Sequence, residues 1–224
     1  MLSSRVKVSC ASGAVLVGMA GLIPVPAEAA TVITWNMGET FGSTMHDTTS
    51  THNGVINGGV VRGVTGHNGL AYAFTGDEGI ITIPHASVLN AGSGAFSVSV
   101  YFKSSTRPSG SVEDYDLVRK GLSTTSGGDW KMEVLSNGRA FCHFRGTRSV
   151  NVTGTSNVVT GSWVKITCSK STTGVRLKVN GTTQGSSGTN PGTVSNAAGM
   201  YVGAKTSSSD VTTGSMDSLT LTKG

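Results

Sequence analysis

The sequence has few charged residues and no dense cluster of them. Lysine and arginine total 17 of the 224 residues, aspartate and glutamate total 12, and the formal net charge is +5. A nucleic-acid-binding surface needs a concentrated basic patch, whereas the basic residues here are spread along the chain. We therefore expect no nucleic-acid partner and interpret the small basic excess as surface charge. An acidic polysaccharide stays open as a ligand that this charge would favour.

Long hydrophobic runs are also absent, with one exception close to the N-terminus. Residues 10–23 (CASGAVLVGMAGLI) are apolar, follow two basic residues, and precede Ala-Glu-Ala at 27–29, the small-residue pattern of a cleavage site. The run is shorter than the about 20 residues that span a bilayer, which disfavours an uncleaved anchor. We predict a secretory signal peptide over residues 1–30, a mature domain over residues 31–224, and a secreted, extracellular protein without membrane insertion.

Cysteine is scarce. Three occur, and Cys10 lies in the predicted signal peptide. The remaining pair, Cys142 and Cys168, is an even number in an exported chain, which predicts one disulfide. A thiol or metal site is the alternative, but the sequence has no C-x-x-C and His143 is the only imidazole near either cysteine.

Helical periodicity is missing as well. No window repeats apolar residues at the i, i+3, i+4, i+7 spacing, whereas residues 96–102 and 175–179 alternate apolar and polar side chains. Such alternation predicts strands with one buried face, as in antiparallel sheets, and Asn-Gly pairs such as 137–138 and 180–181 suit tight turns. About 12–14 short strands must close into a sandwich or barrel to hide their edges, so we predict a single all-β domain.

Several segments carry the motifs of a known family, in that family's order. They include W-N-M-G-E at 35–39, I-T-I-P at 81–84, W-V-K-I-T-C at 163–168 and M-D-S-L at 216–219. In these motifs the chain resembles laminin G-like domains of the concanavalin A-like lectin/glucanase superfamily. The resemblance implies a two-sheet antiparallel jelly-roll sandwich with Trp35 and Trp163 in its core. It does not decide the function, because the superfamily contains enzymes, lectins and adhesion modules.

The motifs of the superfamily's enzymes are absent. A resemblance to its glucanases would require the motif E-x-D-x-E on one strand, and this motif does not occur here. Glycoside hydrolysis needs two carboxylates about 5–10 Å apart. We interpret Glu113, Asp114 and Asp116 as part of a solvated loop, and Glu133 is alone on its predicted strand. We therefore expect no catalysis. A hydrolase or lyase that uses Asp116 or Glu133 is the enzymatic alternative.

The resemblance also implies a cation. Laminin G-like domains often hold one Ca²⁺ through carboxylate and carbonyl oxygens, the ligands that hard cations prefer. Asp47 and Asp217 stand where the family often has acidic residues, so the resemblance implies one structural Ca²⁺ between the first loop and the last strand. The alternative is that Asp47 caps a turn and Asp217 is an acid on a sheet face.

Aromatic residues are few: three Trp, four Tyr and six Phe. Sugars are recognised by aromatic rings with a few polar groups around them. The candidate ligand contacts are Tyr101, Tyr115 and Trp130, with Arg119 and Arg145 as partners for sugars or uronates. The alternative is that these rings are half-buried at a sheet edge.

Together these observations predict a secreted, non-catalytic binding module that recognises a polysaccharide or a cell-surface glycan. The alternative from another class is an adhesion domain that binds an extracellular protein. Nothing in the sequence indicates an oligomeric state.

Overall fold

The computed structural model describes residues 30–207 and 209–224, so the predicted signal peptide lies outside the described residues except for Ala30. In the described part the chain forms sixteen strands and one 3-10 helix, η1 (Ser87–Leu89). No helix there is long and apolar enough to cross a membrane. The strands are β1 (Thr31–Trp35), β2 (Thr44–Met45), β3 (Gly54–Ile56), β4 (Val60–Thr65), β5 (Leu70–Thr75), β6 (Ile81–Ile83), β7 (Phe96–Lys103), β8 (Asp114–Lys120), β9 (Asp129–Leu135), β10 (Arg139–Arg145), β11 (Ser149–Asn157), β12 (Val164–Ser171), β13 (Gly174–Val179), β14 (Thr182–Ser187), β15 (Met200–Val202) and β16 (Thr213–Lys223).

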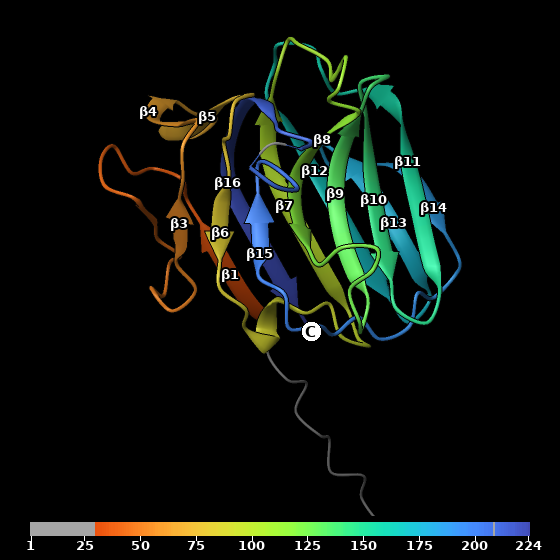
Figure 1. Ribbon diagram of the computed structural model, residues 1–224. Coiled ribbons are helices and arrows are strands. Elements are labelled where there is room, and N and C mark those ends of the chain that lie inside the picture. The colour runs from red at the N-terminus through yellow and green to blue at the C-terminus, as the bar shows by residue number, and fades with distance from the viewer. Residues whose placement is uncertain (1–29, 208) are drawn as a thin grey trace, which may run out of the picture.

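The strands form two antiparallel sheets that face each other (Figure 1). The back sheet has the order β14-β13-β12-β7-β16-β5-β4, with β1 also paired to β16, and the front sheet has the order β11-β10-β9-β8-β15-β6-β3-β2. This arrangement confirms the predicted two-sheet jelly-roll sandwich. The strand number exceeds the expected 12–14 because β2, β3, β6 and β15 have only two or three residues each, too few to show an alternating pattern.

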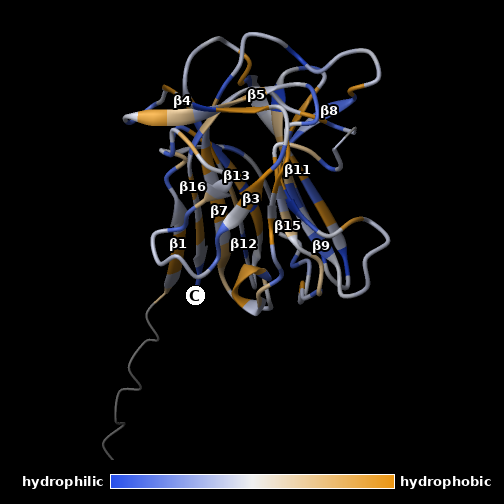
Figure 2. Cartoon of the chain, turned by 60° about the vertical axis from the view of Figure 1, so that its left-hand side comes forward, coloured by the Kyte–Doolittle hydropathy of each residue, from blue (hydrophilic) through white to orange (hydrophobic). Residues whose placement is uncertain are grey.

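The core lies between the inner faces of the two sheets, and the two-residue period of a strand decides which side chains enter it. In β7, Phe96, Val98, Val100 and Phe102 are all buried, as the alternation predicts. Strands of both sheets mix hydrophobic and hydrophilic residues along their length (Figure 2). The phenyl ring of Phe96 crosses the sandwich to contact the ring of Trp130 on β9, with centroids 5.3 Å apart.

A disulfide joins the two sheets. Cys142 on β10 belongs to the front sheet and Cys168 on β12 to the back sheet, and their Cα atoms are 5.6 Å apart. The predicted pairing is therefore confirmed. The two strands face each other across the core and are not hydrogen-bonded neighbours.

The two tryptophans that the resemblance places in the core differ. Trp35 is fully buried, and its indole N–H donates to the carbonyl of His52. Trp163 is only half-buried and lies edge-on to the ring of His67, so its core assignment is wrong. The reason is the strand period. Val164 and Ile166 point into the core, so the residue before Val164 points outward.

Removing the disulfide should lower the stability of the sandwich without changing its fold. The bridge closes a loop with a sequence separation of 26 residues, and loop-closure entropy predicts a loss of about 3–4 kcal/mol in the free energy of unfolding. We expect this loss in the double variant Cys142→Ala, Cys168→Ala, measured by urea unfolding. Reduced wild-type protein should unfold at the same urea concentration as this variant. A midpoint that stays unchanged in both would contradict the prediction.

Candidate functional site

A row of polar side chains crosses the outer face of the front sheet. Arg119 of β8 lies opposite Lys131 of β9, Lys131 opposite His143 of β10, and His143 opposite Asn151 of β11. Residues directly opposite each other in antiparallel strands point to the same face. The register therefore brings together four side chains from four consecutive strands, which we call the polar row.

A pocket of about 500 Å³ opens over the polar row. All four row residues line it, and a turn between β8 and β9 forms another part of its wall through residues 122–124. Leu122 in this turn is 41% exposed. The remaining lining residues are Asp129, Phe141 and Lys205. The pocket thus combines hydrogen-bonding groups with a small apolar surface.

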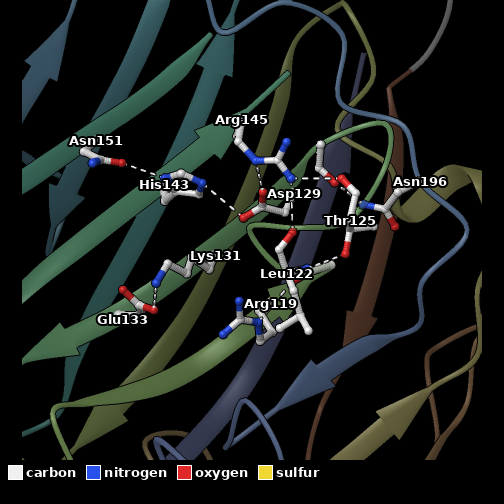
Figure 3. A network of polar contacts seen from close by, with 12 residues as sticks. Arg119, Leu122, Thr125, Asp129, Lys131, Glu133, His143, Arg145, Asn151 and Asn196 are labelled. Atoms are coloured by element: carbon white, nitrogen blue, oxygen red, sulfur yellow. Dashed lines mark hydrogen bonds and ion pairs between the residues drawn. The ribbon is translucent and has the colours of Figure 1, made fainter. Parts of the chain in front are cut away.

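Asp129 connects the polar row to that turn (Figure 3). Its carboxylate accepts a hydrogen bond from Arg145 Nε at 2.5 Å and lies 3.1 Å from His143 Nε2. The Arg145 guanidinium also donates to the carbonyls of Leu122 and Thr125. Burial alone would raise the pKa of Asp129, but hydrogen bonds and charges from His143 and Arg145 outweigh it and lower the pKa. The network therefore holds the turn and the sheet together.

A second group of charges lies beside the polar row. Asp114 and Asp116 of β8 lie near Glu133 of β9, and Asp116 is directly opposite Glu133. Arg119 forms an ion pair with Asp116, and Lys131 with Glu133. Burial, followed by the charge of neighbouring carboxylates, raises the pKa of Asp114 to about 6 and that of Glu133 to about 8.

This acidic group corrects the solvated-loop interpretation for Asp114 and Asp116, whereas Glu113 is exposed and lies in the loop before the strand. Strand β8 begins at Asp114, and Asp116 has no exposed surface. The register shifts between Asp116 and Val118, and this bulge places Asp116 and Arg119 side by side although they are three residues apart. A bulge has no reliable sequence signal, so simple alternation misplaces the side chains before it.

The structure places the ligand contacts predicted from sequence on different parts of the sandwich. Arg119 and Arg145 are on the outer face of the front sheet, and Arg119 lines the pocket. Tyr115 and Trp130 are buried in the core, 2% and 0% exposed, where the Tyr115 hydroxyl donates to the Thr106 carbonyl and the Trp130 indole to the Leu89 carbonyl. Their rings therefore do not line the pocket.

Tyr101 lies on the other side of the sandwich. It belongs to β7 of the back sheet, its ring stacks on His67 with centroids 3.8 Å apart, and Lys165 Nζ is 5.4 Å from its ring centre. With the half-buried Trp163 it forms a small outer cluster that is not part of the pocket.

Asp47 and Asp217, which the resemblance implies as calcium ligands, are both buried and already accept hydrogen bonds. Asp47 accepts from the backbone N–H groups of Thr49 and His52. Asp217 accepts from the Asn68 N–H and the Ser218 hydroxyl. Donors aimed at both carboxylates fit a cation poorly, because the ion would have to displace them. These contacts are typical of turn caps, and calcium at these two residues stays a prediction.

The pocket contains residues that sequence reasoning missed, although a signal for them exists. Along β9, Asp129, Lys131 and Glu133 alternate with three apolar residues, and along β10, Phe141, His143 and Arg145 do the same. The two strands are joined by Asn137-Gly138, a tight-turn pair. Pairing the two segments as a hairpin around this turn places these six side chains on one face of the sheet.

Changing Asp129→Asn should destabilise the protein at neutral pH. The change leaves the partly buried donors of Arg145 and His143 without their ionised acceptor, so we expect a loss of about 1–3 kcal/mol in the free energy of unfolding. Because the pKa of Asp129 is lowered on folding, its contribution is present above the unfolded-state pKa and is lost as pH falls through the folded-state pKa. Urea unfolding from pH 7 down to pH 3 should show the gap between wild type and variant closing. A gap that widens on acidification would contradict this account.

Comparisons with known proteins agree with the fold. Residues 74–223 match the family model described as the concanavalin A-like lectin/glucanases superfamily. No curated protein sequence matches the chain. Among solved structures, domain 4 of AbnA, an extracellular GH43 arabinanase from Geobacillus stearothermophilus solved in complex with arabinotriose, has a TM-score of 0.66 and 18% identity, with coverage of 88% of this chain and 94% of that one.

Two toxin domains are similar to this chain in structure, each at 14% sequence identity. The binding domain of Paraclostridial Mosquitocidal Protein 1 has a TM-score of 0.65, and the binding domain of botulinum neurotoxin serotype D has 0.62. Each match covers 84% of this chain but spans about half of the toxin domain, 48% and 46% respectively. At this identity the likeness shows the fold alone. The fold and the match to the family model over most of the sandwich lead to one conclusion: the chain belongs to the concanavalin A-like lectin/glucanase superfamily.

Proposed function

We propose that the protein is an extracellular, non-catalytic module that binds a glycan in the pocket over the polar row. The observation that carries this proposal is the convergence of Arg119, Lys131, His143 and Asn151 beneath a pocket of about 500 Å³. Sugar hydroxyls both donate and accept hydrogen bonds, so a site with charged, imidazole and amide groups suits them. Phe141 and Leu122 supply an apolar surface for the C–H groups of a sugar ring.

The structural relatives support a binding role in general. One similar domain was solved with arabinotriose, and two others are named as binding domains of toxins. Their low sequence identity carries no information about the ligand of this chain. Glycan binding here therefore rests on the chemistry of the pocket.

The burial of the carboxylates favours binding over hydrolysis. Glycosidases place two carboxyl groups on either side of the scissile bond, where the sugar can reach them. Asp116 is 0% and Glu133 2% exposed, and each is paired with a cation from its own strand. Arg119 and Lys131 line the pocket, whereas the two carboxylates do not.

Export is the remaining part of the proposal. It is supported by the signal-like residues 1–30 and by the disulfide, since disulfides persist mainly in oxidising compartments outside the cytosol.

Binding to a panel of soluble oligosaccharides and insoluble polysaccharides tests the proposal. Lys131→Ala should weaken binding by about tenfold or more, because a hydrogen bond to a charged group contributes about 1.5–3 kcal/mol. The matched control is Lys103→Ala, at an exposed lysine of β7 in the back sheet, which should bind like the wild type. Melting curves of both variants confirm that they are folded.

Three outcomes would contradict the proposal. Absence of binding to every glycan would favour the protein-binding alternative. Equal weakening by both lysine variants would place the site elsewhere. Release of shorter products from a bound polysaccharide, abolished in Glu133→Gln, would replace binding by catalysis.

A further inference from the structure

The acidic group of the front sheet contains more carboxylates than its neighbouring cations pair with. Asp114, Asp116 and Glu133 bring one carboxylate oxygen each to within 4.8 Å of one another. Among the described residues, no other group of three or more acidic, histidine or cysteine side chains is this close. Asp210 adds a fourth negative charge that acts on Asp114 and Asp116.

Three cationic side chains face this group, and each forms an ion pair with one carboxylate. Arg119 pairs with Asp116, Lys131 with Glu133, and Lys205 Nζ lies 3.1 Å from Asp210. Asp114 has no cationic partner among the ion pairs of the described residues. Ionisation of all four carboxylates would therefore leave the half-buried Asp114 without a cationic partner, which is unfavourable.

Two of the buried oxygens also lack any hydrogen-bond donor. Asp116 Oδ1 and Asp114 Oδ1 have no partner, and the side chain of Asp116 is 0% exposed. Buried polar atoms are nearly always satisfied in folded proteins, so each exception calls for a missing partner. That partner has to be a cation or a proton donor, because both atoms are carboxylate oxygens.

We propose that Asp114, Asp116 and Glu133 form a binding site for one hard divalent cation, Ca²⁺ or Mg²⁺. Such ions prefer carboxylate oxygens, and Ca²⁺ binds them at about 2.3–2.6 Å, so two oxygens on opposite sides of one Ca²⁺ are about 4.6–5.2 Å apart. The three ligand atoms lie within 4.8 Å of one another, close enough for one ion to contact all of them. The site is separate from Asp47 and Asp217, whose oxygens accept hydrogen bonds from the backbone N–H groups of His52 and Asn68.

The raised pKa values agree with this assignment. Burial and mutual repulsion raise the pKa of Asp114, Asp116 and Glu133 above their usual range. A cation would relieve that repulsion and let all three ionise, whereas protons alone would satisfy the oxygens one at a time. The cation and the proton explanations differ in one respect: only with a cation site does the melting temperature depend on added metal at fixed pH.

Titration of the metal-stripped protein with CaCl₂ and, separately, MgCl₂ at pH 7.5 tests the proposal. Calorimetry should show one saturable site for at least one of the two ions, and the melting temperature should rise in parallel. Because the probe is the metal alone, this result does not depend on whether the pocket binds a glycan.

Variants locate the site. Asp116→Asn and Glu133→Gln keep the side-chain shape and remove a charge, and each should weaken metal affinity by at least about tenfold, the loss that even an outer-shell change causes. Asp47→Asn tests the alternative calcium position at the first loop and should retain wild-type affinity, and Asp77→Asn, at an exposed acid after β5, is the control. If Asp116→Asn fails to fold, Glu133→Gln and the wild-type titration still decide the question.

Two results would overturn the proposal. One is the absence of heat and of any melting shift in the wild type with either salt up to about 10 mM, tenfold above the Kd of the weakest extracellular Ca²⁺ modules. In that case protons alone satisfy the acidic group. The other is a loss of binding in Asp47→Asn with none in Asp116→Asn, which would place the ion at the first loop.

Discussion

The face-to-face packing of the two sheets is the constraint on which the rest of the structure depends. Every second residue of β9 and β10 has to fill the core against the back sheet, so the residues between them are forced outward. Strand β10 shows this directly, since Cys142 enters the core and bonds to the other sheet while His143 beside it faces the pocket. The same alternation that stabilises the sandwich therefore builds the polar row.

The outer face built in this way is unusually rich in buried charge for a chain with few charged residues. Asp116, Arg119, Asp129 and Glu133 are each at most 3% exposed. Burying paired charges rarely stabilises a protein, because desolvation offsets most of the attraction between them. Hydrophobic side chains packed at these buried positions would often stabilise a fold as well or better. Their concentration in and beside one pocket, with shifted pKa values at Asp116, Asp129 and Glu133, is typical of a site that binds a ligand or an ion.

Sequence reasoning could predict the sandwich because its signals are local. Alternation in β7 and β13, Asn-Gly turns and two cysteines each report on a few neighbouring residues, and the structure confirms what they indicate. The face formed by β9 and β10 could have been placed from their hairpin, but the rest of the site depends on the register of β8. The bulge after Asp116 changes which face the side chains before it occupy. Aromatic identity alone was a poor guide, since Trp130 packs inside the core whereas its polar neighbours Asp129 and Lys131 line the pocket.

The central claim is that ligand recognition occurs on the outer face of the front sheet. The most direct test is a titration of an isotope-labelled sample with an oligosaccharide that the protein binds. The backbone amide chemical shifts are followed during the titration. The account predicts that the largest shifts fall on β8–β11 and on the turn at residues 122–125, with the amides of Lys131, His143 and Asn151 among them. Shifts confined to the back sheet around Tyr101, His67 and Trp163 would contradict it.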